Sequence, residues 1–262
     1  MSKYLDLQQQ IVHLFVDKSV MFEHSELDIA EKLLRDNGYH NFVASSKVKF
    51  AEFIDEHLMM YKTIPFKEWQ GYFEMDCYVS EHLKSNLTVF ERTLNSRISD
   101  YVSGLMASGI LSNFEKNEII VKVRQNPNRK GVNFSKYNGE KSWFYISEMT
   151  FGGMKQLLFW IYDNRRDNYF GIIEGFDFLN KQVENRIDEL NNLRNSLFHN
   201  KPTTVYLIKG NISDKKKIKD RITAVKCIAE LRTHRELSNN VNDVCFYAKR
   251  YIDIKNSLLR KK

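Results

Sequence analysis

Turn-forming residues are scarce in this chain, with only 3 prolines and 11 glycines among 262 residues. Sandwiches and barrels need frequent turns, which are rich in glycine and proline, whereas this scarcity leaves long stretches free to be helical. Hydrophobic residues make up 42% of the chain, as in an ordinary folded protein, and the length suffices for a buried core. The sequence therefore predicts an all-α fold.

Apolar residues recur at helical spacing along most of the chain. Three short helices are predicted within residues 1–65 and form an N-terminal helical subdomain, while residues 66–262 form the main helical core. The three begin near residues 7, 25 and 46, and the third continues to about residue 59. The longest pattern, over 66–108, predicts one helix or two in tandem. Further helices are predicted over 147–162, 169–173, 176–199, 214–237 and 241–259.

One segment departs from helical spacing. Residues 118–123, Glu-Ile-Ile-Val-Lys-Val, alternate β-branched side chains, which is typical of a strand. Residues 124–131 then combine Asn-Pro and glycine turn chemistry with basic side chains. We interpret residues 118–135 as an insertion whose pattern allows a small hairpin. A tight approach of another backbone or a helix start is predicted at residues 151–153, Phe-Gly-Gly.

The chain carries 40 Lys and Arg against 33 Asp and Glu, a formal charge of +7. Nucleic acid is therefore the first partner to consider, and a solubilising surface charge is the alternative. Its 3 cysteines are isolated and lack metal-site spacing, so no disulfide framework, metal or cofactor is expected. No leader and no apolar run of membrane-spanning length is recognised, which predicts a cytoplasmic protein without a membrane partner.

Residues 193–199, Leu-Arg-Asn-Ser-Leu-Phe-His, place polar side chains near the end of a predicted helix. Cleavage of RNA by its own 2′-hydroxyl needs a base, an acid and a cation for the phosphate oxygens. His199 can serve as base or acid, Arg194 offers a fork of donors that matches phosphate, and Asn195 can orient the histidine or contact the phosphate. The simpler interpretation is that Arg194 and His199 cap the last carbonyl groups of the helix.

Helical geometry separates Arg194 from His199. Asn195 and His199 are four residues apart and share a face, whereas Arg194 and His199 are five apart, about 140° around the axis. Three routes could join them: the arginine reaches around the helix, the last turn loosens toward Pro202, or two copies of the helix meet across a twofold axis.

The spacing of arginine and histidine is not specific by itself, because Arg35 and His40 have it too. The intervening Asn37-Gly38 is a helix stop, so this second pair is predicted to be structural.

Residues 193–199 resemble the Arg-Asn-x-x-x-His core of HEPN domains, in particular the Abi-like (AbiD/AbiF) group of abortive-infection proteins. Three further segments resemble this family in the expected order: 66–76, aromatic-rich and ending Tyr-Phe-Glu-Met-Asp; 90–98, Phe-Glu-Arg-Thr-Leu-Asn-Ser-Arg-Ile; and 148–152, Glu-Met-Thr-Phe-Gly. Relatives commonly carry a second histidine where this chain has Asn200. The resemblance implies a HEPN-type helical bundle that dimerises and acts in phage defence or toxin–antitoxin systems.

The leading hypothesis is therefore a homodimeric, metal-independent endoribonuclease with Arg194, Asn195 and His199 as catalytic residues. The alternative is a non-catalytic dimer that binds a structured non-coding RNA, and a plain helical scaffold is a third interpretation. Further basic residues are expected to contact RNA phosphates, with a solvated face as the alternative for each. They are Lys215, Lys216, Lys217, Lys219, Arg129, Lys130, Arg165 and Arg166.

Overall fold

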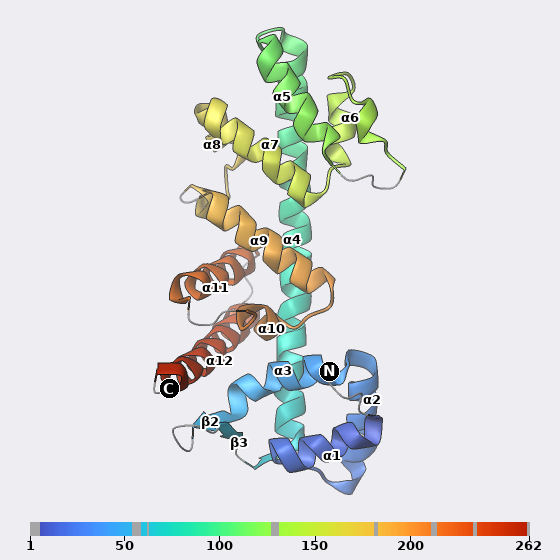
Figure 1. The fold of residues 1–262 in the computed structure, drawn as a ribbon, viewed down its shortest axis with the longest axis vertical. Coiled ribbons are helices and arrows are strands. Elements are labelled where there is room, and N and C mark those ends of the chain that lie inside the picture. The colour runs from blue at the N-terminus through green and yellow to red at the C-terminus, as the bar shows by residue number, and fades with distance from the viewer. Residues whose placement is uncertain are drawn as a thin grey trace. The chain divides into compact units, whose positions relative to one another are not determined.

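The computed structural model describes residues 6–53, 59–61, 63–126, 131–180, 183–210, 214–232 and 235–260. These residues are mostly helical, which confirms the predicted all-α class (Figure 1). None of the described helices is both long enough and apolar enough to cross a membrane. The chain divides into two compact units, Met1–Lys84 with Leu193–Lys262 and Ser85–Asn192. Residues 1–65, the predicted N-terminal subdomain, fall within the first unit.

The first unit opens with three helices, of which the first two lie where the sequence predicts them: α1 (Leu7–Lys18), α2 (Leu27–Asn37) and α3 (Tyr39–Phe50). The predicted third helix over 46–59 is wrong beyond Phe50, because β2 (Ala51–Phe53) pairs antiparallel with β3 (Met59–Tyr61). The remaining short elements are β1 (Val20–Met21), which pairs in parallel with β4 (Ile64–Pro65), and the 3-10 helix η1 (His24–Glu26).

Local sequence explains where these helices begin and end. The side chain of Asp6 accepts from the backbone N–H of Gln9 at 2.8 Å, and the Gln9 side chain accepts from the Asp6 N–H at 3.2 Å. This capping box starts α1. α2 ends at Gly38, whose φ of 77° lies in the left-handed region that glycine adopts without strain.

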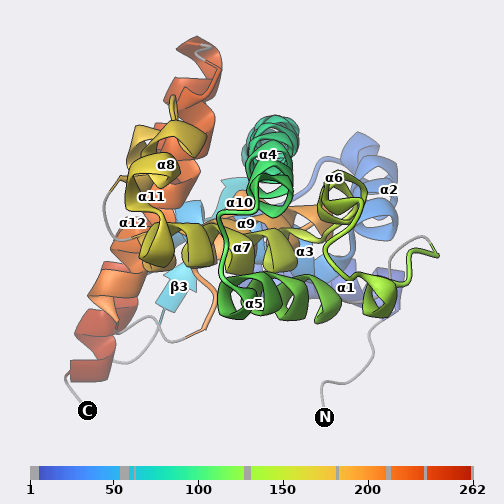
Figure 2. The ribbon, with the colours of Figure 1, turned by 90° about the horizontal axis from the view of Figure 1, so that it is seen from above.

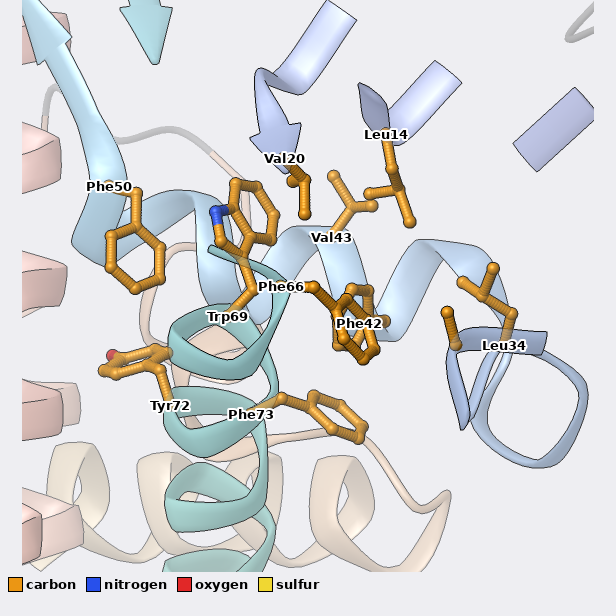
Figure 3. Packing of buried hydrophobic residues seen from close by; sticks show 11 residues of the cluster. Leu14, Val20, Leu34, Phe42, Val43, Phe50, Phe66, Trp69, Tyr72 and Phe73 are labelled. Carbon is orange, nitrogen blue, oxygen red and sulfur yellow. The ribbon is translucent and has the colours of Figure 1, made fainter. Parts of the chain in front are cut away.

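The start of α4 supplies much of the core of the first unit. α4 spans Phe66–Ser108 as one continuous helix, so the long apolar pattern is one helix and not two. Its first turns bury Phe66, Trp69 and Phe73 against Phe42 of α3 (Figure 3). The rings of Phe42 and Phe73 meet edge to face with centroids 5.2 Å apart, a favourable aromatic geometry. Aromatic packing therefore fixes α3 against the start of α4.

The end of the chain completes the first unit with the last turns of α9 (Val183–Phe198), α10 (Thr203–Leu207), α11 (Lys215–Glu230) and α12 (Arg235–Arg260). The helices predicted over 176–199, 214–237 and 241–259 are thus confirmed with shifted ends, and α10 was not predicted. α11 and α12 lie side by side (Figures 1 and 2).

The second unit contains the rest of α4 and a series of shorter elements. They are α5 (Asn113–Arg124), η2 (Phe134–Lys136), α6 (Ser142–Ser147), α7 (Phe151–Asn164), α8 (Arg166–Ile172), η3 (Asp177–Leu179) and the start of α9. α5 and α7 lie side by side in Figure 2. The helix predicted over 147–162 is confirmed as α7 with shifted ends, and α6 was not predicted.

The predicted hairpin within 118–135 is wrong in its first strand, because residues 118–124 belong to α5. Ile119 and Val123 are four residues apart and both fully buried, so one helical face carries the apolar side chains of this segment. Ser112 and Glu115 form a capping box that starts the helix. Residues 127–130, the predicted turn, lie outside the described residues.

The helix start predicted at the Gly152-Gly153 step is confirmed, whereas the alternative, a tight approach of another backbone, is not what the structure has. Thr150 caps α7 by accepting from the Gly153 N–H at 3.3 Å. A Cβ atom on Gly153 would lie 2.0 Å from Nδ2 of Asn126, so the close neighbour is a side chain and not a backbone. A side chain at position 153 would displace the Asn126 amide, which accepts from the Thr150 hydroxyl at 3.0 Å.

Candidate functional site

The end of α9, which carries the predicted catalytic residues, stays helical up to the histidine. The His199 N–H donates to the carbonyl oxygen of Asn195 at 3.2 Å. Asn200 then adopts a left-handed φ of 53°, and two N–H groups beyond His199 bond back to carbonyls of the last turn. This is the Schellman arrangement, in which asparagine can replace glycine. The last turn therefore does not loosen toward Pro202.

Arg194 is held against its own helix beside Phe198. Its guanidinium carbon lies 4.6 Å from the centroid of the Phe198 ring, within cation–π range. Its Nη1 also donates to Oδ1 of Asn195 at 3.4 Å. The structure therefore brings Arg194 and Asn195 together, with the half-exposed ring of Phe198 under the charge.

A second cation lies at the same ring. The Nζ atom of Lys84, on α4, is 5.6 Å from the Phe198 centroid and donates to Oδ1 of Asn200 at 3.3 Å. The carboxylate of Glu81 lies 3.9 Å from this Nζ and offsets part of its charge. Positive charge from two side chains at one aromatic ring attracts an anionic ligand.

No sequence pattern pointed to Lys84. It is separated by 116 residues from Asn200, and no motif spacing links the two segments. Only the packing of α4 beside the end of α9 within the first unit brings this lysine to the site.

The imidazole of His199 is exposed and has no hydrogen-bonding partner among the described residues. Asn195, which was predicted to orient it or to contact phosphate, bonds to Arg194. The histidine is therefore accessible to a substrate, but no described side chain selects which ring nitrogen carries the proton.

The second arginine and histidine pair does not share a helix. α2 ends at Asn37, and His40 belongs to the next helix, α3. Arg35 and His40 therefore lie on opposite sides of the helix stop at Gly38, as the sequence predicts.

A buried polar network fixes the chain directly after the candidate residues. The fully buried carboxylate of Asp76, on α4, accepts from Oγ of Ser45 at 2.6 Å and from the backbone N–H of Thr204 at 3.2 Å. Ser80, one turn further along α4, accepts from the N–H of Thr203 at 2.8 Å. Asp76 and Ser80 thus accept hydrogen bonds from the free N–H groups at the start of α10. α10 begins at Thr203, only four residues beyond His199.

Burial and hydrogen bonding act in opposite directions on Asp76. Burial raises the pKa of its carboxyl group above the ordinary value, and the hydrogen bonds from Ser45 and Thr204 lower it in part. The phenol of Tyr72, which shares a 3.3 Å hydrogen bond with the Thr204 hydroxyl, has its pKa raised well above 10 by burial and by Asp76. These groups are enclosed, so we assign them to structure.

The predicted RNA-contacting lysines of the first unit occupy the first turns of α11. Lys215, Lys216, Lys217 and Lys219 are all exposed, and the side chain of Asp214 caps the helix by accepting from the Lys217 N–H at 3.0 Å. Positive side chains at the positive end of a helix dipole are unfavourable for the helix itself. Helix stability therefore does not explain the run of lysines.

The remaining predicted RNA contacts lie elsewhere. Arg165 and Arg166 belong to the second unit, where Arg165 forms an ion pair with Glu115 and Arg166 lies over the ring of Tyr162 at 5.1 Å. Arg129 and Lys130 lie outside the described residues. Contact of these four with RNA stays a prediction.

Comparison with the models of known protein families, with curated protein sequences and with solved structures found no match for this chain. In the described part of the chain, no three His, Cys, Asp or Glu side chains are grouped as a metal ion would require.

Proposed function

We propose that this chain is a HEPN-type abortive-infection protein of the Abi-like group that acts on RNA as a metal-independent endoribonuclease. The observation that carries the proposal is the convergence of Arg194 and Lys84 on the ring of Phe198, next to the exposed His199. Two cations beside an imidazole are the groups that cleavage of a phosphodiester requires.

The chemistry would follow from the position of these groups. His199 would take the proton of the 2′-hydroxyl or deliver one to the leaving 5′-oxygen. Arg194 would donate to the phosphate oxygens as negative charge develops on them, and Lys84 would add a second positive charge. Asn195 would hold the guanidinium through its 3.4 Å hydrogen bond. Attack of the 2′-oxygen on phosphorus, with departure of the 5′-oxygen, would leave a 2′,3′-cyclic phosphate.

The test is cleavage of one RNA substrate by a set of matched variants. His199→Ala should lose about 10²–10⁴-fold in rate, the usual effect of removing a positioned acid or base. Arg194→Lys should not restore full rate, because a point charge cannot reproduce the bidentate fork. Lys84→Gln should lose up to about 10²-fold, since it removes the charge but can still bond Asn200. Two control variants should keep a cleavage rate within about threefold of wild type. They are Lys67→Ala, which removes an exposed lysine of α4, and His40→Ala.

Two further conditions test the reaction class. A single 2′-deoxy nucleotide at the cut site should abolish cleavage there, and chelator should have little effect. Cleavage that survives the deoxy substitution would rule out attack by the 2′-hydroxyl. Loss of activity with chelator would point to metal-dependent hydrolysis.

A non-catalytic role is the second candidate, and the lack of a described partner for the His199 imidazole favours it. In that case the dimer would bind a structured non-coding RNA through the same cations. RNA binding that is lost in Arg194→Ala but unchanged in His199→Ala, with no cleavage by wild type, would select this alternative.

We also propose a homodimer with a composite site, because the five-residue offset leaves Arg194 and His199 on different faces of α9. Mixing inactive Arg194→Ala protein with inactive His199→Ala protein should then restore part of the activity. Restoration requires subunit exchange, which fluorescence energy transfer between donor-labelled and acceptor-labelled subunits can follow. Absence of restoration after exchange would exclude a site shared between subunits.

A further inference from the structure

The two C-terminal helices of the first unit enclose a groove that the proposed chemistry does not use. The groove has a volume of about 780 Å³ and runs along one face of α11 and α12. It follows α11 from Lys215 to Lys226, which at a rise of about 1.5 Å per residue is a length of about 16 Å. Three turns of another helix would fill this length.

The floor of the groove is mainly apolar, and the polar side chains of Thr223, Asn242 and Asn256 also line the groove. It is lined by Ile218, Ile222, Cys245 and Ile252, and burial raises the pKa of the Cys245 thiol to about 12, so this side chain stays neutral. Phe246 also lines the groove and is 61% exposed. A large aromatic side chain left in water beside an aliphatic floor is typical of an interaction surface.

The rim of the groove is basic. The described residues that line it include the lysines Lys215, Lys219, Lys226 and Lys249, and the sole acidic one is Asp253. Lys216 and Lys217 do not line the groove, because they face other directions on α11. The lysine run of the sequence is therefore divided, and half of it belongs to this surface.

We propose that this groove binds an acidic amphipathic helix of a partner protein, with its apolar stripe on Phe246 and its carboxylates on the lysine rim. Helices that lie in grooves between two helices are recognised in this way. The positive rim supplies the charge complementarity, and a second copy of this chain, with a formal charge of +7, is a poorer match.

RNA fits the groove less well than such a helix. Grooves that hold single strands combine positive charge with aromatic side chains on which successive bases stack. Phe246 is the single aromatic side chain among the described residues that line this groove, and the floor is aliphatic. A polyanion would satisfy the lysines and leave the exposed ring of Phe246 without an apolar partner.

The probe for the test is a synthetic helical peptide of four turns with leucines on one face and glutamates on both flanks. We expect it to bind the full chain, and a scrambled peptide of the same composition to bind at least about tenfold more weakly. Lys215→Glu with Lys219→Glu should weaken binding by at least about tenfold. Lys216→Glu with Lys217→Glu is the matched control, with the same change of net charge, and should cost less than about threefold.

Two further arms make the result decisive. A peptide with lysines in place of the glutamates should prefer the Lys215→Glu, Lys219→Glu protein over wild type. Phe246→Ser should weaken binding by about tenfold, whereas Phe114→Ser, an exposed phenylalanine on α5, should not change it. The proposal would be overturned if the two double lysine variants lost peptide affinity equally, or if the scrambled peptide bound as tightly as the designed one. Either result would show that only general electrostatic attraction is present.

An RNA arm separates the two classes of ligand. A single-stranded oligouridylate should bind with little dependence on Phe246. Tighter binding of this RNA than of the peptide, with loss on Phe246→Ser, would assign the groove to RNA instead. None of these measurements depends on cleavage, so the groove and the proposed role of His199 can fail independently.

Discussion

Replacing Asp76 by alanine should destabilise the first unit strongly. The carboxylate is fully buried and joins three segments, because Ser45 of α3 and Thr204 of α10 both donate to it from either side of α4. Alanine removes the acceptor and leaves the donors in place. The cost is then set by donors that are buried without a partner and not by the loss of a few apolar atoms.

The magnitude follows from counting those donors. The Ser45 hydroxyl loses its acceptor at 2.6 Å, and the Thr204 N–H loses its acceptor at 3.2 Å. A buried donor left unsatisfied costs about 1–3 kcal/mol, so the two together cost about 2–6 kcal/mol. A domain of ordinary stability has about 5–15 kcal/mol in total, so this single change removes a large share of it.

Urea unfolding followed by far-ultraviolet circular dichroism measures the effect. Ser45→Ala is the matched variant, because it removes one donor and leaves the carboxylate bonded to Thr204, so it should cost about 1–3 kcal/mol. Asp253→Ala, an exposed aspartate on α12, should change stability by less than about 0.5 kcal/mol. A loss below about 1 kcal/mol for Asp76→Ala would show that the network does not hold α10 in place.

The pKa of Asp76 is raised in the fold, so the stability it contributes is full below the ordinary aspartate pKa of about 3.9 and is lost as pH rises through the raised value. The stability of wild type relative to Asp76→Asn should therefore fall as pH rises above about 4. Urea unfolding over a pH series measures this difference, and a rise with pH would contradict the prediction. Gly153→Ala should cost about 1–3 kcal/mol in thermal unfolding because its Cβ would overlap Asn126, whereas Gly152→Ala, with no neighbour closer than 3.9 Å, should not; equal effects would refute the close approach. Lys216→Ala with Lys217→Ala should lower the salt dependence of RNA binding by up to about two units of slope, and an unchanged slope would leave both lysines in solvent.

The helical class could be predicted from the sequence because it depends on local features, namely few turn residues and a long apolar period. The strand predicted over residues 118–123 was wrong because the apolar side chains there fit both the spacing of a strand and the spacing of a helix. Residues 118–123 alternate as in a strand, yet Ile119 and Val123 also lie four residues apart, as on one face of a helix. Burial of these two side chains on the same face stabilises the helix. The capping box of Ser112 and Glu115 was a signal in the sequence that favoured the helix.

The candidate site could be predicted only in part, for a physical reason. Arg194, Asn195 and His199 are close in sequence, so their motif is visible along the chain. Lys84 joins them only through the packing of α4 beside the end of α9, and no local pattern encodes that contact. The role of Asn200 is similar, since its left-handed turn is a property of the folded helix end.

The cap of α9 and the Asp76 network together bear on how Arg194 and His199 could cooperate. The helix stays hydrogen-bonded up to His199, and the chain is held again at Thr203 and Thr204 by buried bonds to α4. Loosening the last turn would have to break bonds at one or both of these ends, each worth about 0.5–3 kcal/mol. Of the three routes considered, the structure therefore opposes the loosened turn. A guanidinium held on Phe198 by a cation–π contact and on Asn195 by a hydrogen bond also resists reaching around the helix. The remaining route, a second α9 that faces the first, needs neither change.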